Sequence, residues 1–446
     1  MNMYLKIAKQ YLIIEAAILT FLITVLFYTP CYSGDIPNVI TISEGLKIAT
    51  EKNRIIKISS FNKDISRADT LVAKSRFFPT IEITASDTFL RYQPGINFGS
   101  MSAFTGEKES LSYGINIYQT IYDFGGRTSL YDSSKLAFDS ANLDFERIKN
   151  IVALNFITAY FDLLETDKLI LIAQKEVEMF ETHLRVAQNL YEEGVITKND
   201  LLQAEVKLSD AKQQLLTTKN LRAINTARIN NILSLPLINE IQATDIPRDS
   251  RYDLELITAW RNALEQRPEL KIIGNQIKIN DLEERAKKSE YYPSLYAQGG
   301  YNYTENRYLL YEDNWSLIVG VNFNLFSGGS TKAEISQMEY RKGQLLEQRE
   351  KLLEDIKLEV EKSYLEMKNA DEKIHVTKDA ISQAEENLRI NKIKYEEGVG
   401  TATDVIDAIT LLTKAETNFY SALYEYSRAQ AGFIYSMGID LVSAYR

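Results

Sequence analysis

Three aspartates just after two glycine turns are the residues in this sequence whose type and spacing best suit a chemical role. Asp404 and Asp407 are three positions apart, so on a helix both carboxylates lie on one face. Asp200 corresponds to Asp404 in an earlier copy of the same segment, where Gln203 takes the place of the second aspartate. Carboxylates grouped in this way attract cations wherever they gather at a constriction.

Helix capping is a second interpretation of two of these aspartates. Thr197 stands three residues before Asp200, and Thr401 stands three residues before Asp404. This is the spacing of a capping box, in which the threonine and the acidic residue bond to each other's backbone N–H groups. The two roles are compatible. Asp407 lies outside the capping pattern, so we expect it to be the aspartate with the strongest functional role.

An enzyme finds little support in this chain. The two histidines, His183 and His375, occupy non-equivalent positions of expected helices, and Cys31 is the single cysteine. Such a set does not build a metal centre, and no nucleophile stands in a pattern with a base. We therefore expect no catalytic residue, no cofactor and no metal site. The net charge of −10 also disfavours a nucleic-acid partner, which would require a basic patch.

The chain is an internal duplication. The phrase Tyr-Glu-Glu-Gly-Val occurs at residues 191–195 and again at 395–399, 204 positions later. The Pro-containing segment at 77–79 returns at 291–293 with an offset of 214, so the segment from this proline to the following glycine pair is longer in the first copy. We therefore expect two structural repeats, residues 34–240 and 241–446, that build one body.

Each repeat contains a long helical hairpin. Residues 127–193 contain neither glycine nor proline, and Gly343 alone interrupts the matching stretch at 330–397. A helix of that length is on the order of 100 Å long. Apolar residues follow heptad spacing on both arms of the expected hairpins, residues 127–235 and 330–438, which predicts coiled-coil packing. A coiled-coil stalk without a channel would explain the hairpins alone.

Short amphipathic strands precede each hairpin. Residues 80–124 and 294–326 alternate apolar with small or polar side chains, and we expect a strand pair in each, with loops near 94–109 and 305–314. Such strands suit a membrane β-barrel with a water-filled lumen, and several chains must contribute because four strands cannot close a barrel. The 27 tyrosines, many near the strand ends, suit an interfacial aromatic girdle. The alternative is a small soluble sheet that caps the helices.

The N-terminus carries a targeting signal. Residues 1–33 combine a basic start, an apolar core and a short polar exit, which predicts a secretory signal peptide. An uncleaved membrane anchor and a lipid on Cys31 are the alternatives. Removal of residues 1–33 changes the net charge from −10 to −11 and leaves no cysteine, so the mature chain depends on packing and assembly for its stability.

Taken together, these motifs resemble the TolC-like outer membrane factors over nearly the whole mature chain. The residues that carry the resemblance are Ala263, Leu264, Arg267, Pro268, Pro293, Phe326, Ser327, Gly328, Gly329, Tyr395, Gly398, Thr401, Asp404, Val405, Ile406, Asp407 and Ala408. The resemblance implies an α+β membrane protein that forms a homotrimer in the lipid of the outer membrane of a Gram-negative bacterium. It implies a shared barrel of twelve strands and an α-helical tunnel that extends into the periplasm.

The resemblance also implies a function and a set of site residues. The protein would be a passive exit duct of an efflux or type I secretion system, opened by a periplasmic adaptor and an inner-membrane pump of the RND or ABC type. Asp404, Asp407 and Asp200 would line the entrance. The tip and its adaptor contacts would comprise Tyr191, Glu193, Gly194, Tyr395, Glu397 and Gly398. Ile196 and Gly400 stand where some members carry a basic latch, so closure needs another explanation. Cargo and partner identity stay open.

Overall fold

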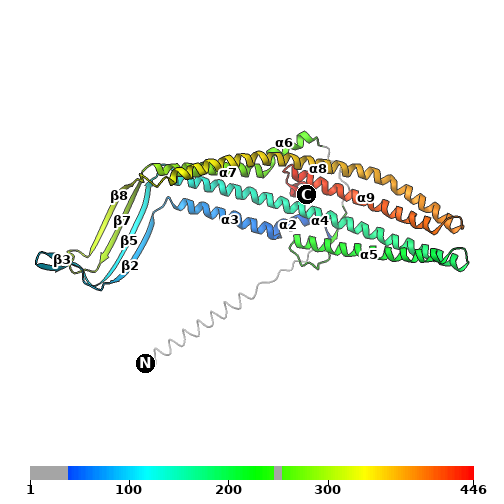
Figure 1. Ribbon diagram of the computed structural model, residues 1–446, viewed down its shortest axis with the longest axis horizontal. Coiled ribbons are helices and arrows are strands. Elements are labelled where there is room, and N and C mark those ends of the chain that lie inside the picture. The colour runs from blue at the N-terminus through cyan, green and yellow to red at the C-terminus, as the bar shows by residue number, and fades with distance from the viewer. Residues whose placement is uncertain (1–38, 246–253, 446) are drawn as a thin grey trace, which may run out of the picture.

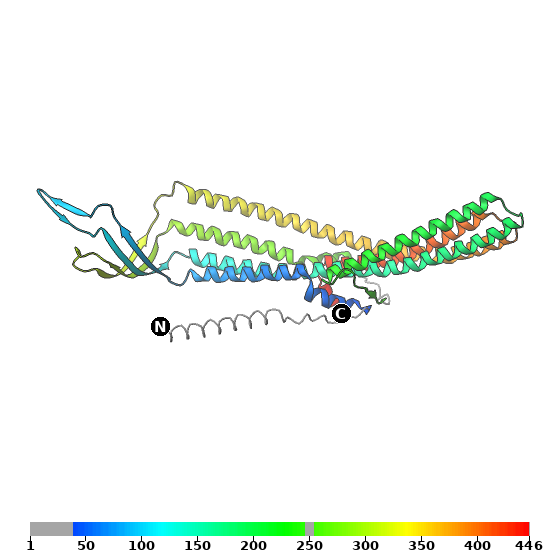
Figure 2. The same cartoon turned by 90° about the horizontal axis from the view of Figure 1, so that it is seen from below.

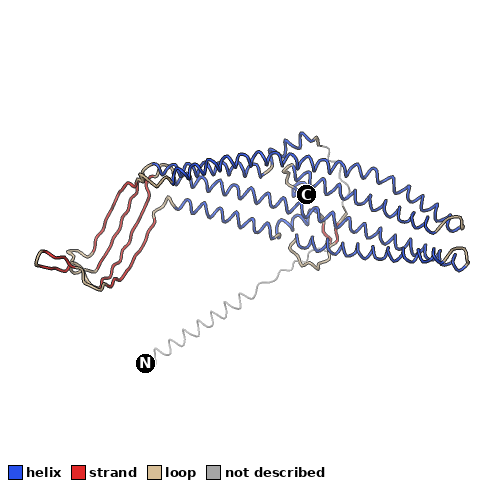
Figure 3. Tube along the Cα trace, viewed as in Figure 1, coloured by secondary structure: helices blue, strands red, loops and turns tan. Residues whose placement is uncertain are grey.

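The computed structural model describes residues 39–245 and 254–445, which form one elongated body with strands at one end and helical hairpin tips at the other (Figure 1). The expected signal peptide at residues 1–33 lies outside the described residues. A second view, turned by 90°, shows the same two hairpins running to a common end (Figure 2). Strands and helices thus occupy separate parts of the molecule (Figure 3).

The two halves contain the same series of elements. The first half contains α2 (Ile42–Lys52), α3 (Arg54–Ser75), β2 (Thr80–Phe89), β5 (Glu109–Tyr122), α4 (Gly126–Glu192) and α5 (Lys198–Ile232). The second contains α6 (Leu256–Gln266), α7 (Pro268–Lys288), a 3-10 turn (Ser289–Tyr291), β7 (Ser294–Thr304), β8 (Asp313–Asn322), α8 (Ser330–Glu396) and α9 (Ala402–Ser436). A short helix α10 (Leu441–Ala444) follows, and β1 (Val39–Ile40) pairs in parallel with β6 (Gln242–Ala243).

The long helices are equal in length and in their local start signals. Helices α4 and α8 contain 67 residues each, and α5 and α9 contain 35 each. A helix of 67 residues is about 100 Å long. Helices α4 and α8 each begin directly after a left-handed glycine, Gly125 or Gly329, both with φ of 87°. Only glycine adopts this conformation without strain, so the chain leaves the sheet and enters the helix at a defined angle.

The four strands form one antiparallel sheet in the order β2-β5-β7-β8. Alternate residues point to opposite faces of a sheet, and one face here is apolar. This face, which no other described part of the chain covers, includes Ile81, Ile83, Ile115, Ile117, Leu317 and Val319. The opposite face includes Thr84, Asn116, Gln298, Asn302 and Ser316. Strands β2 and β8 are open edges of the sheet.

The strands differ from the sequence expectation in three places. A two-stranded ribbon, β3 (Gly95–Phe98) with β4 (Met101–Phe104), occupies the expected loop between β2 and β5. Strand β8 ends at Asn322, which pairs with Ser294, so residues 323–326 continue the alternating pattern beyond the sheet. The partner strand cannot extend the ladder, because Pro293 precedes it and lacks a backbone N–H. A register shift between Thr120 and Tyr122 also removes Ile121 from the alternation.

The main hydrophobic core lies at mid-length, where α4 packs on α2, α5 and α9. Phe156, Tyr160 and Phe433 are its largest fully buried side chains. The Tyr160 hydroxyl donates to the carbonyl oxygen of Ile40 or Thr244, at 3.0 and 2.8 Å. Both acceptors lie at the β1–β6 pair, so one buried side chain ties the start of the described chain to the link between the two halves.

Candidate functional site

The far end of the helical body consists of two turns with identical backbone geometry. Gly194 and Gly398 adopt left-handed conformations with φ of 75° and 73°. The N–H of Val195 donates to the Leu190 carbonyl, and that of Val399 to the Lys394 carbonyl, both at 2.9 Å. These bonds close the ends of α4 and α8 in the manner of a Schellman motif. The glycine in each Tyr-Glu-Glu-Gly-Val phrase is therefore a requirement of the turn.

Asp200 and Asp404 are members of helix capping boxes. The Thr401 hydroxyl donates to the Asp404 carboxylate at 2.7 Å, and the Thr401 backbone N–H does so at 3.0 Å. The pair Thr197 and Asp200 has the same contacts at 2.8 and 3.0 Å. The side-chain bond from Thr401, with its backbone bond second, lowers the pKa of Asp404 below its usual value. Both aspartates thus have the structural role that the spacing predicts.

Asp407 differs from Asp404 in its surroundings. It lies one turn further along α9 and is exposed, whereas Val405, Ile406 and Ala408 are buried against the neighbouring helices. A helix projects residues 404 and 407 from one side. The carboxylates of Asp404 and Asp407 therefore both lie on the exposed side of α9, away from the helices on which it packs, and both contact solvent.

The tip residues of the two repeats are not equivalent in burial. Glu193, Gly194, Glu397 and Gly398 are exposed. Tyr191 is 39% exposed, but its counterpart Tyr395 is 2% exposed and lies within a second hydrophobic cluster with Phe180, Leu388 and Ile409. Burial, followed by the nearby charge of Asp200, raises the pKa of Tyr395. Tyr395 of α8 is therefore enclosed by helices of both hairpins.

His183 is a further member of this tip that the sequence argument did not assign to a site. Its side chain on α4 is 4% exposed, and its ring lies 5.1 Å from the Tyr395 ring between centroids. Burial, with a smaller effect from Lys392, lowers the pKa of His183 to about 4. The available signal was its spacing, because His183 follows Phe180 by three residues and precedes Ala187 by four, as an inward-facing position does.

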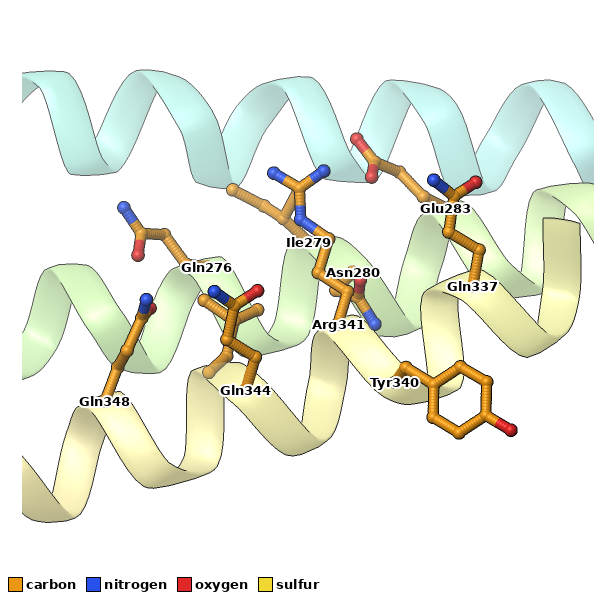
Figure 4. Close-up of a pocket in the computed structure, with 10 residues that line it drawn as sticks. Gln276, Ile279, Asn280, Glu283, Gln337, Tyr340, Arg341, Gln344 and Gln348 are labelled. Atoms are coloured by element: carbon orange, nitrogen blue, oxygen red, sulfur yellow. The ribbon is translucent and has the colours of Figure 1, made fainter.

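A polar groove of about 670 Å³ lies between α7 and α8, far from the tip (Figure 4). Its lining includes Gln276, Glu283, Arg341 and Gln344, a set that suits contact with water rather than a core. The buried Asn280 joins the two helices below it by donating to the Met338 carbonyl at 3.0 Å. Across residues 39–245 and 254–445 there is no cluster of three or more histidine, cysteine or acidic residues able to hold a metal ion.

The combination of an open antiparallel sheet with paired long hairpins is the fold of outer-membrane channel proteins. The chain is similar to the outer-membrane channel OprN, with a TM-score of 0.78 and 16% identity over 92% of this chain and 91% of that one. It is also similar to the CmeC outer membrane channel of Campylobacter jejuni, with a TM-score of 0.80 and 16% identity over 89% and 85%. Among the described helices, none is long and apolar enough to cross a membrane.

The chain belongs to the outer membrane efflux protein family, whose model matches residues 46–234 and 259–438. Outer membrane protein TolC of Vibrio cholerae is 22% identical over 367 residues, 79% of this chain and 80% of that protein. The probable efflux pump outer membrane protein TtgC of Pseudomonas putida is 20% identical over 377 residues, 82% and 76% of the two chains. The alkaline protease secretion protein AprF of Pseudomonas aeruginosa is 22% identical over 294 residues, 64% and 60%.

The family settles the class and location of the protein. It is an outer-membrane protein of the TolC type from a Gram-negative cell, with its helical part in the periplasm. Its relatives include an outer membrane protein of an efflux pump and an alkaline protease secretion protein.

Proposed function

We propose that three copies of this chain form a passive duct that conducts substrate from an inner-membrane pump, through a periplasmic adaptor, to the outside of the cell. The single observation that carries the proposal is the four-stranded sheet, which has an uncovered apolar face and two open edges. A membrane tolerates neither unpaired strand edges nor polar groups facing lipid. Pairing β8 of one copy with β2 of the next leaves no strand edge unpaired, and the closed sheet can then turn its apolar face to the lipid and its polar face inward.

Three such sheets give a closed barrel of twelve strands. The apolar face, with Ile83, Leu317 and Val319 at 79%, 70% and 67% exposure, would face outer-membrane lipid. The opposite face, rich in Asn, Ser, Thr and Gln, would line a water-filled lumen. The two structural repeats, residues 34–240 and 241–446, would each contribute two strands and one helical hairpin to the protomer.

The helices support the same assembly. Four apolar side chains on α3, namely Ile58, Phe61, Ile65 and Val72, are each about 60% or more exposed. Their spacing of three, four and seven residues forms one stripe along the helix. An apolar stripe of this length is normally covered by a partner helix. We assign that role to a neighbouring copy, which would close the helices into a periplasmic tunnel.

The hairpin tips would form the entrance of this tunnel. Asp404 and Asp407, with Asp200 of the first repeat beside them, would bring carboxylates from three copies to one constriction and favour cations there. The exposed residues Glu193, Gly194, Glu397 and Gly398, together with Tyr191, would contact the adaptor. In this arrangement Tyr395 braces the tip from inside, and energy for transport comes from the pump, of RND or ABC type.

Single-channel recording tests this function directly. The purified mature protein, with its mass in detergent determined beforehand, is placed in planar bilayers beside the variants Asp407→Asn and Asp210→Asn. Asp210 is an exposed aspartate further along α5 and serves as the matched control. We expect discrete cation-favouring steps whose selectivity falls in Asp407→Asn and is unchanged in Asp210→Asn.

Two results would contradict parts of the proposal. If the protein remains monomeric and does not insert into the bilayer, the duct proposal is refuted, and a coiled-coil stalk becomes the better explanation of the hairpins. Conducting trimers whose selectivity is the same in all three proteins would leave the duct but remove Asp407 from its entrance.

A further inference from the structure

A buried contact between His183 and Tyr395 joins the two helical hairpins near their tips. His183 belongs to α4 of the first hairpin, and Tyr395 belongs to α8 of the second. Their side chains are 4% and 2% exposed, and their ring centroids lie 5.1 Å apart at an interplanar angle of 47°.

Both side chains bury a polar atom without a partner. Within the described part of the chain, neither His183 Nε2 nor the Tyr395 hydroxyl oxygen has a hydrogen-bond partner. A cavity of about 20 Å³ lies beside them, which is enough for about one water molecule. Its other lining residues are Thr182, Val186, Lys392, Glu396 and Val405. Unpaired buried polar atoms weaken a contact, so the free energy needed to separate these two side chains is small.

We propose that the neutral imidazole of His183 holds the first hairpin against the second at Tyr395, and that protonation of His183 separates the two hairpins at the tip. The contact itself requires only the protomer. Its consequence for transport rests on the proposed function, because separation of the hairpins opens the duct only if their tips form its entrance.

The surroundings of His183 oppose a positive charge. Helix α8 contributes Lys392, whose charge repels an imidazolium, and Glu396, which is exposed to solvent. Helix α5 contributes Asp200, whose charge acts on Tyr395. Helix α9 contributes the apolar Val405 to the cavity wall. Because burial, and to a smaller extent the charge of Lys392, disfavour the imidazolium, the imidazole is neutral in the closed contact, and its pKa falls to about 4.

The sign of the pH dependence follows from the difference between the pKa of His183 in the closed contact and its pKa when the hairpins are separated. A separated, hydrated His183 has its ordinary pKa of 6.5, so between pH 6.5 and about 4 the separated state binds more protons than the closed one. The closed contact is therefore fully stable above pH 6.5 and weakens as the pH falls toward 4. Between pH 7.5 and pH 4.5 the ratio of separated to closed contacts rises by up to about 70-fold for each protomer.

Hydrogen exchange tests the contact without a conducting channel. Backbone amide exchange is measured by mass spectrometry on the full-length protein in detergent, over residues 176–206 and 388–412, at pH 7.5 and 4.5. The proteins are wild type, His183→Phe and His375→Phe, and His375 is the exposed histidine of α8 that serves as the matched control. Comparison at equal pH cancels the intrinsic exchange rate.

We expect wild type and His375→Phe to lose at least tenfold more protection than His183→Phe when the pH is lowered. Equal losses in wild type and His183→Phe would overturn the proposal, because exposed carboxylates titrate in both. If His183→Phe does not fold, exchange at the imidazole C2 position of the wild-type protein decides. A midpoint below pH 5 for His183 supports the proposal, and one near 6.5 overturns it. If hydrogen exchange shows the expected effect of His183→Phe but the protein does not conduct ions in bilayers, only the proposed duct is refuted.

Discussion

Truncation of the two tip tyrosines is expected to have very different effects, although both stand at the same place in the duplicated phrase. Tyr395 is 2% exposed and contacts the His183 ring, whereas Tyr191 is 39% exposed. Tyr395→Ala therefore removes an aromatic ring from a packed cluster. Tyr191→Ala shortens a side chain that already contacts solvent, and so it is the matched control.

The expected magnitudes follow from burial. Removal of a large aromatic side chain from a core costs about 3–5 kcal/mol, partly in lost transfer free energy and partly in the cavity that remains. We expect about 3 kcal/mol for Tyr395→Ala, since its neighbours at the tip can partly collapse, and about 1 kcal/mol for Tyr191→Ala. The difference of about 2 kcal/mol corresponds to about a 30-fold change in a local opening equilibrium.

Amide hydrogen exchange at neutral pH measures this opening directly. In Tyr395→Ala, peptides from the C-terminal end of α8 and from the start of α9 should exchange about 30-fold faster than in Tyr191→Ala. Peptides from the mid-length core around Phe156 report whether the protein as a whole is intact, and they should be unchanged in both. Equal effects of the two substitutions at the tip would refute the argument from burial.

Two further predictions concern the mid-length core. Gly45→Ala should destabilise the protein by about 1–3 kcal/mol in thermal unfolding, because a Cβ there would lie 2.0 Å from Cζ of the fully buried Phe156. Gly274→Ala is the control, since a Cβ there meets nothing within 4 Å, and it should be neutral or stabilising by up to about 1 kcal/mol. A loss of stability in Gly274→Ala equal to that of Gly45→Ala would contradict the packing argument. Tyr160→Phe should cost about 1–2 kcal/mol, since the buried hydroxyl's hydrogen bond to the Ile40 or Thr244 carbonyl is lost. An unchanged unfolding temperature in that variant would show that water replaces the hydroxyl.

Much of the architecture could be predicted from local signals in the sequence. The stretch without glycine or proline corresponds to α4 and its counterpart, interrupted only by Gly343, to α8; the glycine of each duplicated phrase adopts the left-handed turn that ends a long helix. The threonine–aspartate spacing correctly predicted both capping boxes, because such bonds span only three residues. Alternation of side chains predicted the strands, although it could not show where β8 loses its partner or that β3 and β4 form an extra ribbon.

The differences between the two copies depend on the tertiary structure. Tyr191 and Tyr395 are followed by the same four residues, but only Tyr395 lies between the two hairpins. His183 similarly becomes a buried partner of Tyr395 through a contact between residues more than two hundred positions apart. The sequence by itself determined the helices, their caps and their turns, because these depend on hydrogen bonds between near neighbours. Burial and pKa depend on which distant helix covers a side chain, and only the packed structure decided that.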